Sequence, residues 1–274
     1  MGIEAAIDAS RTACCPEPPA VSCCTAFYEQ EWVRRIAGGV FHPGGADLTR
    51  RTIAAMDLKP GAHVLDLACG TGSSAVMLAS EGEFRLSAAD RSRLNLDHAR
   101  RTAEERIAPE RLKFYQADAA HLPFKDGTFD GLLSECAFSL YRDKPAVLAE
   151  MRRVLKPAGR LGLTDMAVER ELPPDLAAVA APWMCLADTR SAAGYRRLFE
   201  EAGYWLAEFS DESDALCDML GTIKRNLLLL LAGSALNGLP AAFDLVAIKP
   251  WLDRFAAEIE AGGIRYLRFN LERA

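Results

Sequence analysis

Four acidic residues stand at the ends of short apolar runs: Asp66, Asp90, Asp118 and Glu135. Such runs are typical of buried parallel strands, where an isolated carboxylate is costly unless something nearby needs a hydrogen-bond acceptor. The carboxyl ends of parallel strands meet at one edge of a sheet, and open α/β sheets bind their ligands there. We therefore expect these four carboxylates to line one ligand site.

A glycine-rich turn, Ala68-Cys69-Gly70-Thr71-Gly72, follows the first of these runs and leads into a helix-forming stretch. Two glycines let the backbone pass close to a ligand, and the free N–H groups of the following helix point back to the same place. This arrangement is typical of the nucleotide-binding corner of a doubly wound sheet, in which Asp90 would bind ribose hydroxyls. Ser74 or Ala75 replaces the third glycine of the dinucleotide fingerprint, which favours a nucleoside without a pyrophosphate over NAD.

The chain carries eight cysteines, more than packing requires, and thiolates suit soft, thiophilic centres. Cys136 directly follows Glu135, and Cys185 lies in a segment that we expect to close over the same edge of the sheet. The length of the chain and its α/β pattern disfavour a secreted disulfide framework, so we interpret the cysteines as reduced thiols. For Cys69 we expect a structural role or a backbone hydrogen bond to the bound ligand, and for Cys217 a packing role. The other four form two adjacent pairs, Cys14-Cys15 and Cys23-Cys24, which either hold a soft ion or are incidental.

The elements that must position these residues alternate regularly, which predicts an α/β fold with a doubly wound, mainly parallel sheet and helices on both faces. Downstream we expect a strand at Tyr204–Phe209, long helices at Asp211–Ala232 and Ala241–Glu260, and a last strand at Ile264–Asn270. The alternating elements are strands at 62–67, 84–89, 111–116, 128–135 and 159–165 and helices at 73–80, 94–107 and 143–155.

The composition is that of an ordinary globular protein, and 274 residues suffice for one large domain with additions. We expect a flexible Cys- and Pro-rich arm at 1–24, a helical cap at 25–60 and the main domain at 61–274, with a helical insertion at about 211–262. A net charge of −6 argues against a nucleic-acid partner. With no signal segment visible and no apolar run long enough to span a membrane, we expect a cytoplasmic protein.

Four motifs carry a resemblance to the class I S-adenosylmethionine-dependent methyltransferases: LDLACGTG, AAD ending at Asp90, ADAAHLPF and RVLKPAGRL. The resemblance covers about Ala62–Phe209. It implies a seven-stranded Rossmann-like sheet with the last strand antiparallel at its edge, helices before the sheet that cover the site, and S-adenosylmethionine as the cofactor. In this family the position of Asp118 meets the adenine amino group; a cap on the following turn is the alternative. The expected cofactor-binding residues are Asp66, Ala68, Gly70, Gly72, Asp90, Arg91, Asp118, Ala119 and Glu135.

The segment SECAFSLYRDKPAVLAEMRRVLKPAGRLGLTDM, followed by PWMCLADTRSAAGYRRLFEEAGY, resembles the arsenite methyltransferases. In that family, cysteines at the positions of Cys136 and Cys185 hold trivalent arsenic for attack on the methyl group. A third sulfur would come from the N-terminal pairs, with Cys23 and Cys24 as candidates, or from glutathione or another thiol. That family's cysteine after the glycine turn is absent here, where Ser73-Ser74-Ala75-Val76 stands.

The leading interpretation is therefore a methyltransferase that acts on thiol-bound arsenite, with Cys136 and Cys185 as catalytic, arsenic-holding residues. One alternative keeps the fold and the cofactor but has a small organic acceptor of the quinone or secondary-metabolite type. A second alternative is a non-catalytic protein that binds a metalloid. None of the four histidines has an obvious acidic partner in the sequence, and His42 is as compatible with an ordinary loop residue as with a catalytic base.

Overall fold

The structure is a computed structural model of the whole chain, and it describes residues 28–39, 41–104, 106–174, 176–177, 186, 188–232 and 245–274. The expected arm at 1–24, with both of its cysteine pairs, lies outside the described residues. Cys185 lies outside them as well. The division of the chain into an arm, a cap and a main domain therefore stays a prediction.

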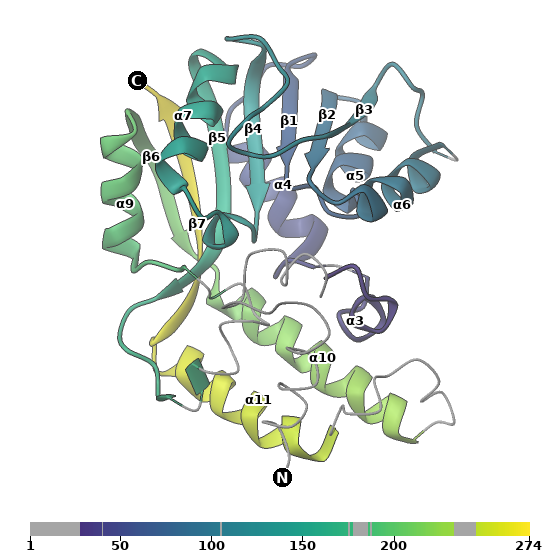
Figure 1. Cartoon of the computed structure of the whole chain (residues 1–274), viewed down its shortest axis with the longest axis vertical. Helices are drawn as coiled ribbons and strands as arrows, with labels where there is room; N and C mark the ends of the chain where they lie inside the picture. Colours follow the sequence, from purple (N-terminus) through teal and green to yellow (C-terminus); the bar gives the residue numbers. More distant parts are fainter. Residues whose placement is uncertain are drawn as a thin grey trace, which may run out of the picture.

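Seven strands form one sheet in the order β3-β2-β1-β4-β5-β7-β6, which confirms the predicted fold class (Figure 1). The first five strands run parallel to one another, and β7 is antiparallel to both β5 and β6. The strands are β1 (His63–Leu67), β2 (Arg85–Asp90), β3 (Leu112–Gln116), β4 (Phe129–Glu135), β5 (Leu155–Val168), β6 (Tyr204–Asp211) and β7 (Ile264–Arg273).

Helices cover both faces of the sheet because each strand of its centre is apolar on both sides. Ile53 of α4 and Val76 of α5 belong to one buried cluster, whereas Val147 of α7 and Phe199 of α9 belong to another. The helices of the two layers are α4 (Gly45–Ala55), α5 (Ser73–Glu81) and α6 (Arg93–Glu104) on one face, and α7 (Lys144–Val154) and α9 (Ala192–Glu201) on the other.

The last strand was expected at the edge of the sheet, and this is wrong: β7 lies between β5 and β6, and β6 forms the edge. The reason is visible in the burial of the two strands. Side chains of β7 are buried on both faces, including Tyr266, Leu267 and Phe269, whereas β6 exposes Trp205 to solvent. A strand with two apolar faces is stable only where neighbours and helices cover both.

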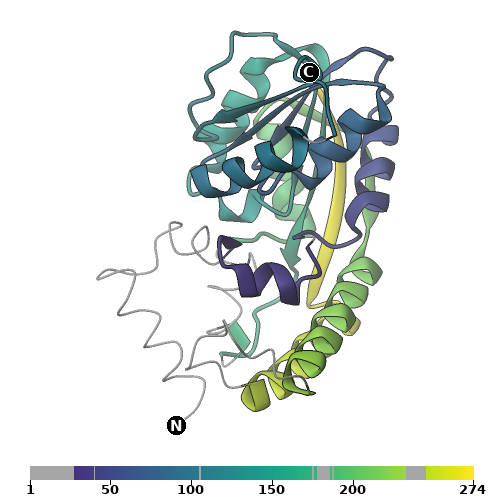
Figure 2. The ribbon, with the colours of Figure 1, turned by 90° about the vertical axis from the view of Figure 1, so that its right-hand side faces the viewer.

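Below the carboxyl ends of the strands, α10 (Ser213–Ala232) and α11 (Leu245–Glu260) pack side by side and extend away from the sheet (Figures 1 and 2). The short helix α3 (Glu31–Ile36) contacts α10 on the same side. A third buried cluster, which includes Leu216, Leu220 and Phe255, joins these helices to the start of β7. These elements form a helical lobe that faces the edge of the sheet where the predicted site residues lie. No helix among the described residues is long and apolar enough to cross a membrane.

Candidate active site

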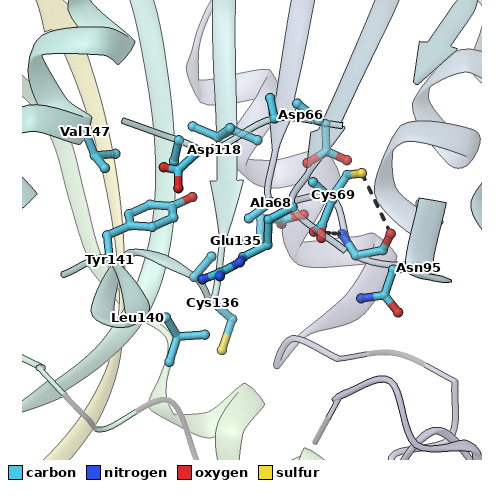
Figure 3. Close-up of a pocket in the computed structure, with 18 of the residues that line it drawn as sticks. Asp66, Ala68, Cys69, Asn95, Asp118, Glu135, Cys136, Leu140, Tyr141 and Val147 are labelled. Carbon is cyan, nitrogen blue, oxygen red and sulfur yellow. Dashed lines mark hydrogen bonds between the residues drawn. The ribbon is translucent and has the colours of Figure 1, made fainter. Parts of the chain in front are cut away.

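A cavity of 590 Å³ lies at the carboxyl ends of the parallel strands, where the sequence predicts the site. Figure 3 shows Asp66 and Asp118 at one end of it and Cys136 and Leu140 at the other. Eight of the nine residues expected to bind a cofactor line the cavity; the exception is Gly72. The eight are Asp66, Ala68, Gly70, Asp90, Arg91, Asp118, Ala119 and Glu135.

The glycine turn takes a left-handed backbone at three positions: φ is +60° at Ala68, +53° at Gly70 and +77° at Gly72. A Cβ at Gly70 would meet nothing within 4 Å, so the turn leaves open space beside the backbone. A Cβ at Gly72 would lie only 2.8 Å from the Cβ of Ala99. The two positions therefore require glycine for different reasons. Gly72 lets α5 and α6 pack closely, and Gly70 leaves an open space beside the backbone, a cradle that a ligand can fill.

Asp66 is buried at the end of β1 with one oxygen, Oδ2, that has no hydrogen-bond partner among the described residues. Burial, and then the nearby carboxylates of Glu135 and Asp90, raises its pKa well above the usual range. The pKa of Asp90 is also raised by burial, although the backbone N–H groups of Ser92 and Gly70 donate to it at 2.7 and 2.9 Å. This end of the cavity thus concentrates negative charge and acceptors, which suits a cationic ligand that carries hydroxyl or ammonium donors.

Asp118 follows β3, and its Oδ1 accepts a hydrogen bond from the N–H of Ala120 at 2.9 Å. The turn-capping alternative is therefore observed, and the same exposed carboxylate also lines the cavity. Asn95 of α6 is a lining residue that the sequence analysis missed; its buried Oδ1 has no partner within the described part of the chain. Its only signal in the sequence was its place shortly after Asp90.

Glu135 ends β4 and is held by two hydroxyl groups: Thr49 donates to Oε1 at 2.9 Å, and Ser74 donates to Oε2 at 2.6 Å. His42 Nε2 lies 3.7 Å from Oε2 of the same carboxylate. His42, which had no acidic partner in the sequence, therefore has one in space. The pairing was invisible in the sequence because the loop before α4 and the end of β4 are far apart along the chain and meet only in the fold.

Cys136 lines the cavity with φ at +51°, and its sulfur points away from the end of the strand (Figure 3). Cys69, Cys136 and Cys217 are not joined to one another in disulfide bonds within the described part of the chain. Burial raises the pKa of Cys69 well above its usual range, which fits the structural role expected of it. Among the described residues, no three His, Cys, Asp or Glu side chains form a group that could hold a metal ion.

A buried lysine, Lys144 at the start of α7, holds the loop that follows Cys136 through hydrogen bonds. Its Nζ donates to the carbonyl oxygens of Ser139 and Tyr141 at 3.3 and 2.9 Å and to Asp188 at 2.8 Å. Burial raises the pKa of the neighbouring Asp165 to about 6, although that carboxylate accepts the N–H and the hydroxyl of Ser139. These contacts fix the loop that carries Leu140 and Tyr141 into the cavity.

A family model described as a methyltransferase domain matches residues 58–207, more than half of the chain. Methyltransferase GfsG of Streptomyces halstedii is 34% identical over 173 residues, which are 62% of this chain and 62% of GfsG. An O-methyltransferase of Pyrenophora dematioidea is 28% identical over 67% of this chain and 70% of that protein. A demethylmenaquinone methyltransferase of Beutenbergia cavernae is 38% identical over 43% of this chain and 46% of that protein.

The fold is shared with phosphoethanolamine N-methyltransferase 2 of Haemonchus contortus, solved in complex with S-adenosyl-L-methionine. The TM-score is 0.75 at 20% sequence identity, over 91% of this chain and 57% of that one. The unpartnered oxygens of Asp66 and Asn95 and the open cradle at Gly70 fit such a cofactor, which offers ammonium and hydroxyl donors. The chain belongs to the methyltransferase-domain family. This match confirms the predicted class, the S-adenosylmethionine-dependent methyltransferases, for the domain at residues 58–207.

Proposed function

We propose that this protein transfers the methyl group of S-adenosylmethionine to a small organic acceptor. The observation that carries the proposal is one continuous cavity whose carboxylate-lined end opens onto a wall of Tyr28, Phe41, Leu140 and Tyr141. Tyr28 and Phe41 form an edge-to-face pair with ring centroids 5.6 Å apart. A carbon-rich, aromatic wall of this kind binds an organic ring or chain better than it binds a hydrated oxyanion.

The carboxylate-lined end holds the cofactor in this proposal. When bound, the cofactor supplies an electrophilic methyl group on a positively charged sulfur. Asp90 accepts hydrogen bonds from the ribose hydroxyls. The unpartnered oxygens of Asp66 and Asn95 accept hydrogen bonds from other donors of the cofactor. Gly70 lets the backbone approach without a collision. The adenine side is formed by Arg91, Asp118 and Ala119.

The relatives support an organic acceptor over arsenite, because their names specify O-methyltransferases and a demethylmenaquinone methyltransferase. Of the expected arsenic ligands, Cys136 is the one that the structure describes, and it lines the acceptor end of the cavity. The other expected sulfur ligands, Cys185, Cys23 and Cys24, lie outside the described residues. Arsenite stays the second candidate acceptor because Cys136 lines the cavity. Glutathione would be a partner only if arsenite is the acceptor. The cytoplasmic location stays a prediction.

The test is an incubation with methyl-labelled S-adenosylmethionine and a panel of acceptors: catechols, hydroquinones, indoles, amines, and arsenite with glutathione. Wild type is compared with Cys136→Ser, and Asp90→Asn is the control for cofactor binding. We expect label in an organic product, retained in Cys136→Ser and lost in Asp90→Asn. Methylated arsenic that disappears in Cys136→Ser, with no organic product, would overturn the proposal in favour of the arsenite interpretation.

A further inference from the structure

Lys144, at the start of α7, is the one lysine that the fold buries within the described part of the chain. Its position is costly in two ways. Burial removes water from the ammonium group and lowers its pKa, and the first turn of a helix disfavours a positive charge. The helix does not need Lys144 for its cap, because Asp143 accepts the N–H of Ala146 at 2.9 Å. A buried cation in this place therefore needs another reason.

The ammonium group of Lys144 joins two segments that are far apart in the chain. On one side, Nζ donates to the carbonyl oxygens of Ser139 and Tyr141 in the loop after β4, at 3.3 and 2.9 Å. On the other side, it donates to Oδ2 of Asp188 at 2.8 Å, a residue 44 positions further along. The three acceptors match the three hydrogens of an ammonium group, so an apolar side chain could not make the same contacts.

The loop after β4 also has an anchor that does not involve Lys144. Asp165 of β5 accepts hydrogen bonds from the N–H and the hydroxyl of Ser139, at 2.5 and 2.9 Å. These two bonds hold the loop to the sheet, and they would remain if Lys144 were replaced. What Lys144 adds is the link between this loop and the segment that carries Asp188.

Both linked segments lie at the acceptor end of the cavity or pack behind it. Leu140 and Tyr141 of the loop line the cavity. Leu186, two residues before Asp188, is 8% exposed and belongs to the buried cluster of the helical lobe, against which Leu140 packs. Lys144 therefore ties a wall of the cavity to the lobe that faces it.

We propose that Lys144 is a positioning residue for the methyl acceptor, which holds the wall of Leu140 and Tyr141 against the helical lobe through Asp188. This inference rests on the proposed function and identifies residues that set the affinity for its acceptor. Neither Lys144 nor Asp188 lines the cavity, so both act through the wall. A wall that contacts the acceptor equally before and during methyl transfer affects KM and leaves kcat nearly unchanged.

The kinetic test compares Lys144→Met with Lys156→Met. Lys156 also pairs with an aspartate, Asp130 at 2.6 Å, but does not line the cavity. The acceptor is the catechol, hydroquinone, indole or amine that wild type methylates fastest. We expect Lys144→Met to raise the KM of that acceptor by about fivefold or more, with kcat within about twofold of wild type. Its affinity for S-adenosylhomocysteine should also stay within about twofold, because the carboxylate-lined end keeps its contacts. Lys156→Met should match wild type in all three quantities.

A lysine with a merely structural role would give a different result. Asp188 is not left buried and unpaired by Lys144→Met, since its side chain is 37% exposed and Nη1 of Arg190 lies 3.0 Å from it. Replacing a buried charge with an apolar side chain is then close to neutral for stability. We expect the urea midpoint of Lys144→Met to stay within about 10% of wild type. A lower midpoint, with equal losses of affinity for the acceptor and for S-adenosylhomocysteine, would show a general loosening and overturn the proposal.

Asp188→Ala tests the same link from its other side and decides the question if Lys144→Met does not fold. It leaves the hydrogen bonds from Lys144 to Ser139 and Tyr141 in place. We expect the acceptor KM to rise by about threefold or more. The double variant should raise KM no further than Lys144→Met alone, because the two residues form one link. Fully additive effects would show that they act independently.

A further readout does not depend on turnover. Hydrogen–deuterium exchange of peptides that cover residues 138–142, measured without an acceptor, should be faster in Lys144→Met and in Asp188→Ala than in wild type. It should be unchanged in Lys156→Met. Exchange that neither Lys144→Met nor Asp188→Ala accelerates would show that the link does not hold the loop, and would overturn the proposal.

The outcomes separate this inference from the proposed function. If wild type methylates an organic acceptor and both Lys144→Met and Asp188→Ala keep its KM within about twofold, the positioning role is wrong and the proposed function stands. If no organic acceptor is methylated while S-adenosylhomocysteine still binds, the proposed function falls, and the role of Lys144 in acceptor binding falls with it.

Discussion

Replacing Asp66 with asparagine is expected to stabilise the cofactor-free protein and to lower its affinity for the cofactor. The side chain is 3% exposed, Oδ2 lacks a partner, and Glu135 and Asp90 add repulsion to the cost of burial. An unsatisfied buried polar group costs about 1–3 kcal/mol, and a charged one costs more. Asparagine has nearly the same shape, keeps an oxygen for the N–H of Ala75 and carries no charge. We expect Asp66→Asn to raise the free energy of unfolding by roughly 1–2 kcal/mol at pH 8.

The gain should depend on pH in a defined direction. Because the pKa of Asp66 is raised in the folded protein, the unfolded chain releases this proton first as the pH rises. The free energy of unfolding of wild type therefore falls between the ordinary carboxyl pKa and the raised one, and stays lower above it. The stabilisation by Asp66→Asn should be absent below the ordinary carboxyl range and complete only above the raised pKa.

Urea unfolding between pH 4 and pH 8, followed by tryptophan fluorescence, measures this difference. Asp218→Asn, a change of the same kind on an exposed residue of α10, is the matched control. S-adenosylhomocysteine at about 100 times its Kd should stabilise wild type by about 2.7 kcal/mol, and the variant by clearly less at the same concentration. A variant that is less stable than wild type at pH 8 without ligand, or a gain that does not change with pH, would refute the reasoning.

Three further substitutions test the glycine turn, each by urea unfolding and by titration with S-adenosylhomocysteine. Gly72→Ala places a Cβ 2.8 Å from the Cβ of Ala99 at φ +77°, so we expect a loss of about 2–4 kcal/mol; a loss below about 1 kcal/mol would contradict the packing argument. Gly70→Ala meets open space, so it should cost only about 1–2 kcal/mol but weaken ligand binding by about 10-fold or more; unchanged affinity would mean that the ligand does not occupy the cradle. Ala68→Gly relieves a left-handed alanine at φ +60° and should stabilise the protein by up to about 1 kcal/mol, and a clear destabilisation would contradict that reading.

The carboxylate-lined end of the cavity could be predicted from the sequence because its residues follow local patterns. Asp66 and Asp90 end apolar strands, and the glycine turn lies between them, so each was placed by its own neighbours in the chain. Parallel strands then bring these positions to one edge whatever their order in the sheet. The place of β7 could not be predicted in the same way, because alternation of elements gives their type and not their neighbours.

The acceptor end could not be predicted, because contacts between distant segments build it. His42 meets Glu135 only when the loop before α4 reaches the end of β4. Lys144 looks like a surface residue in the sequence, since lysine is rarely buried. In the fold it is 2% exposed and ties the loop after β4 to Asp188. No local pattern records either pairing.

This difference between the two ends explains why relatives of this chain carry different acceptors in their names. The carboxylate-lined end depends on strand ends and one turn, which the sheet itself holds in place. The acceptor end depends on the segments around Tyr28, His42 and Tyr141, which lie outside the alternating strands and helices and can change without disturbing the sheet. Similarity over the sheet therefore supports the cofactor, whereas the acceptor must be argued from the side chains that line the other end of the cavity.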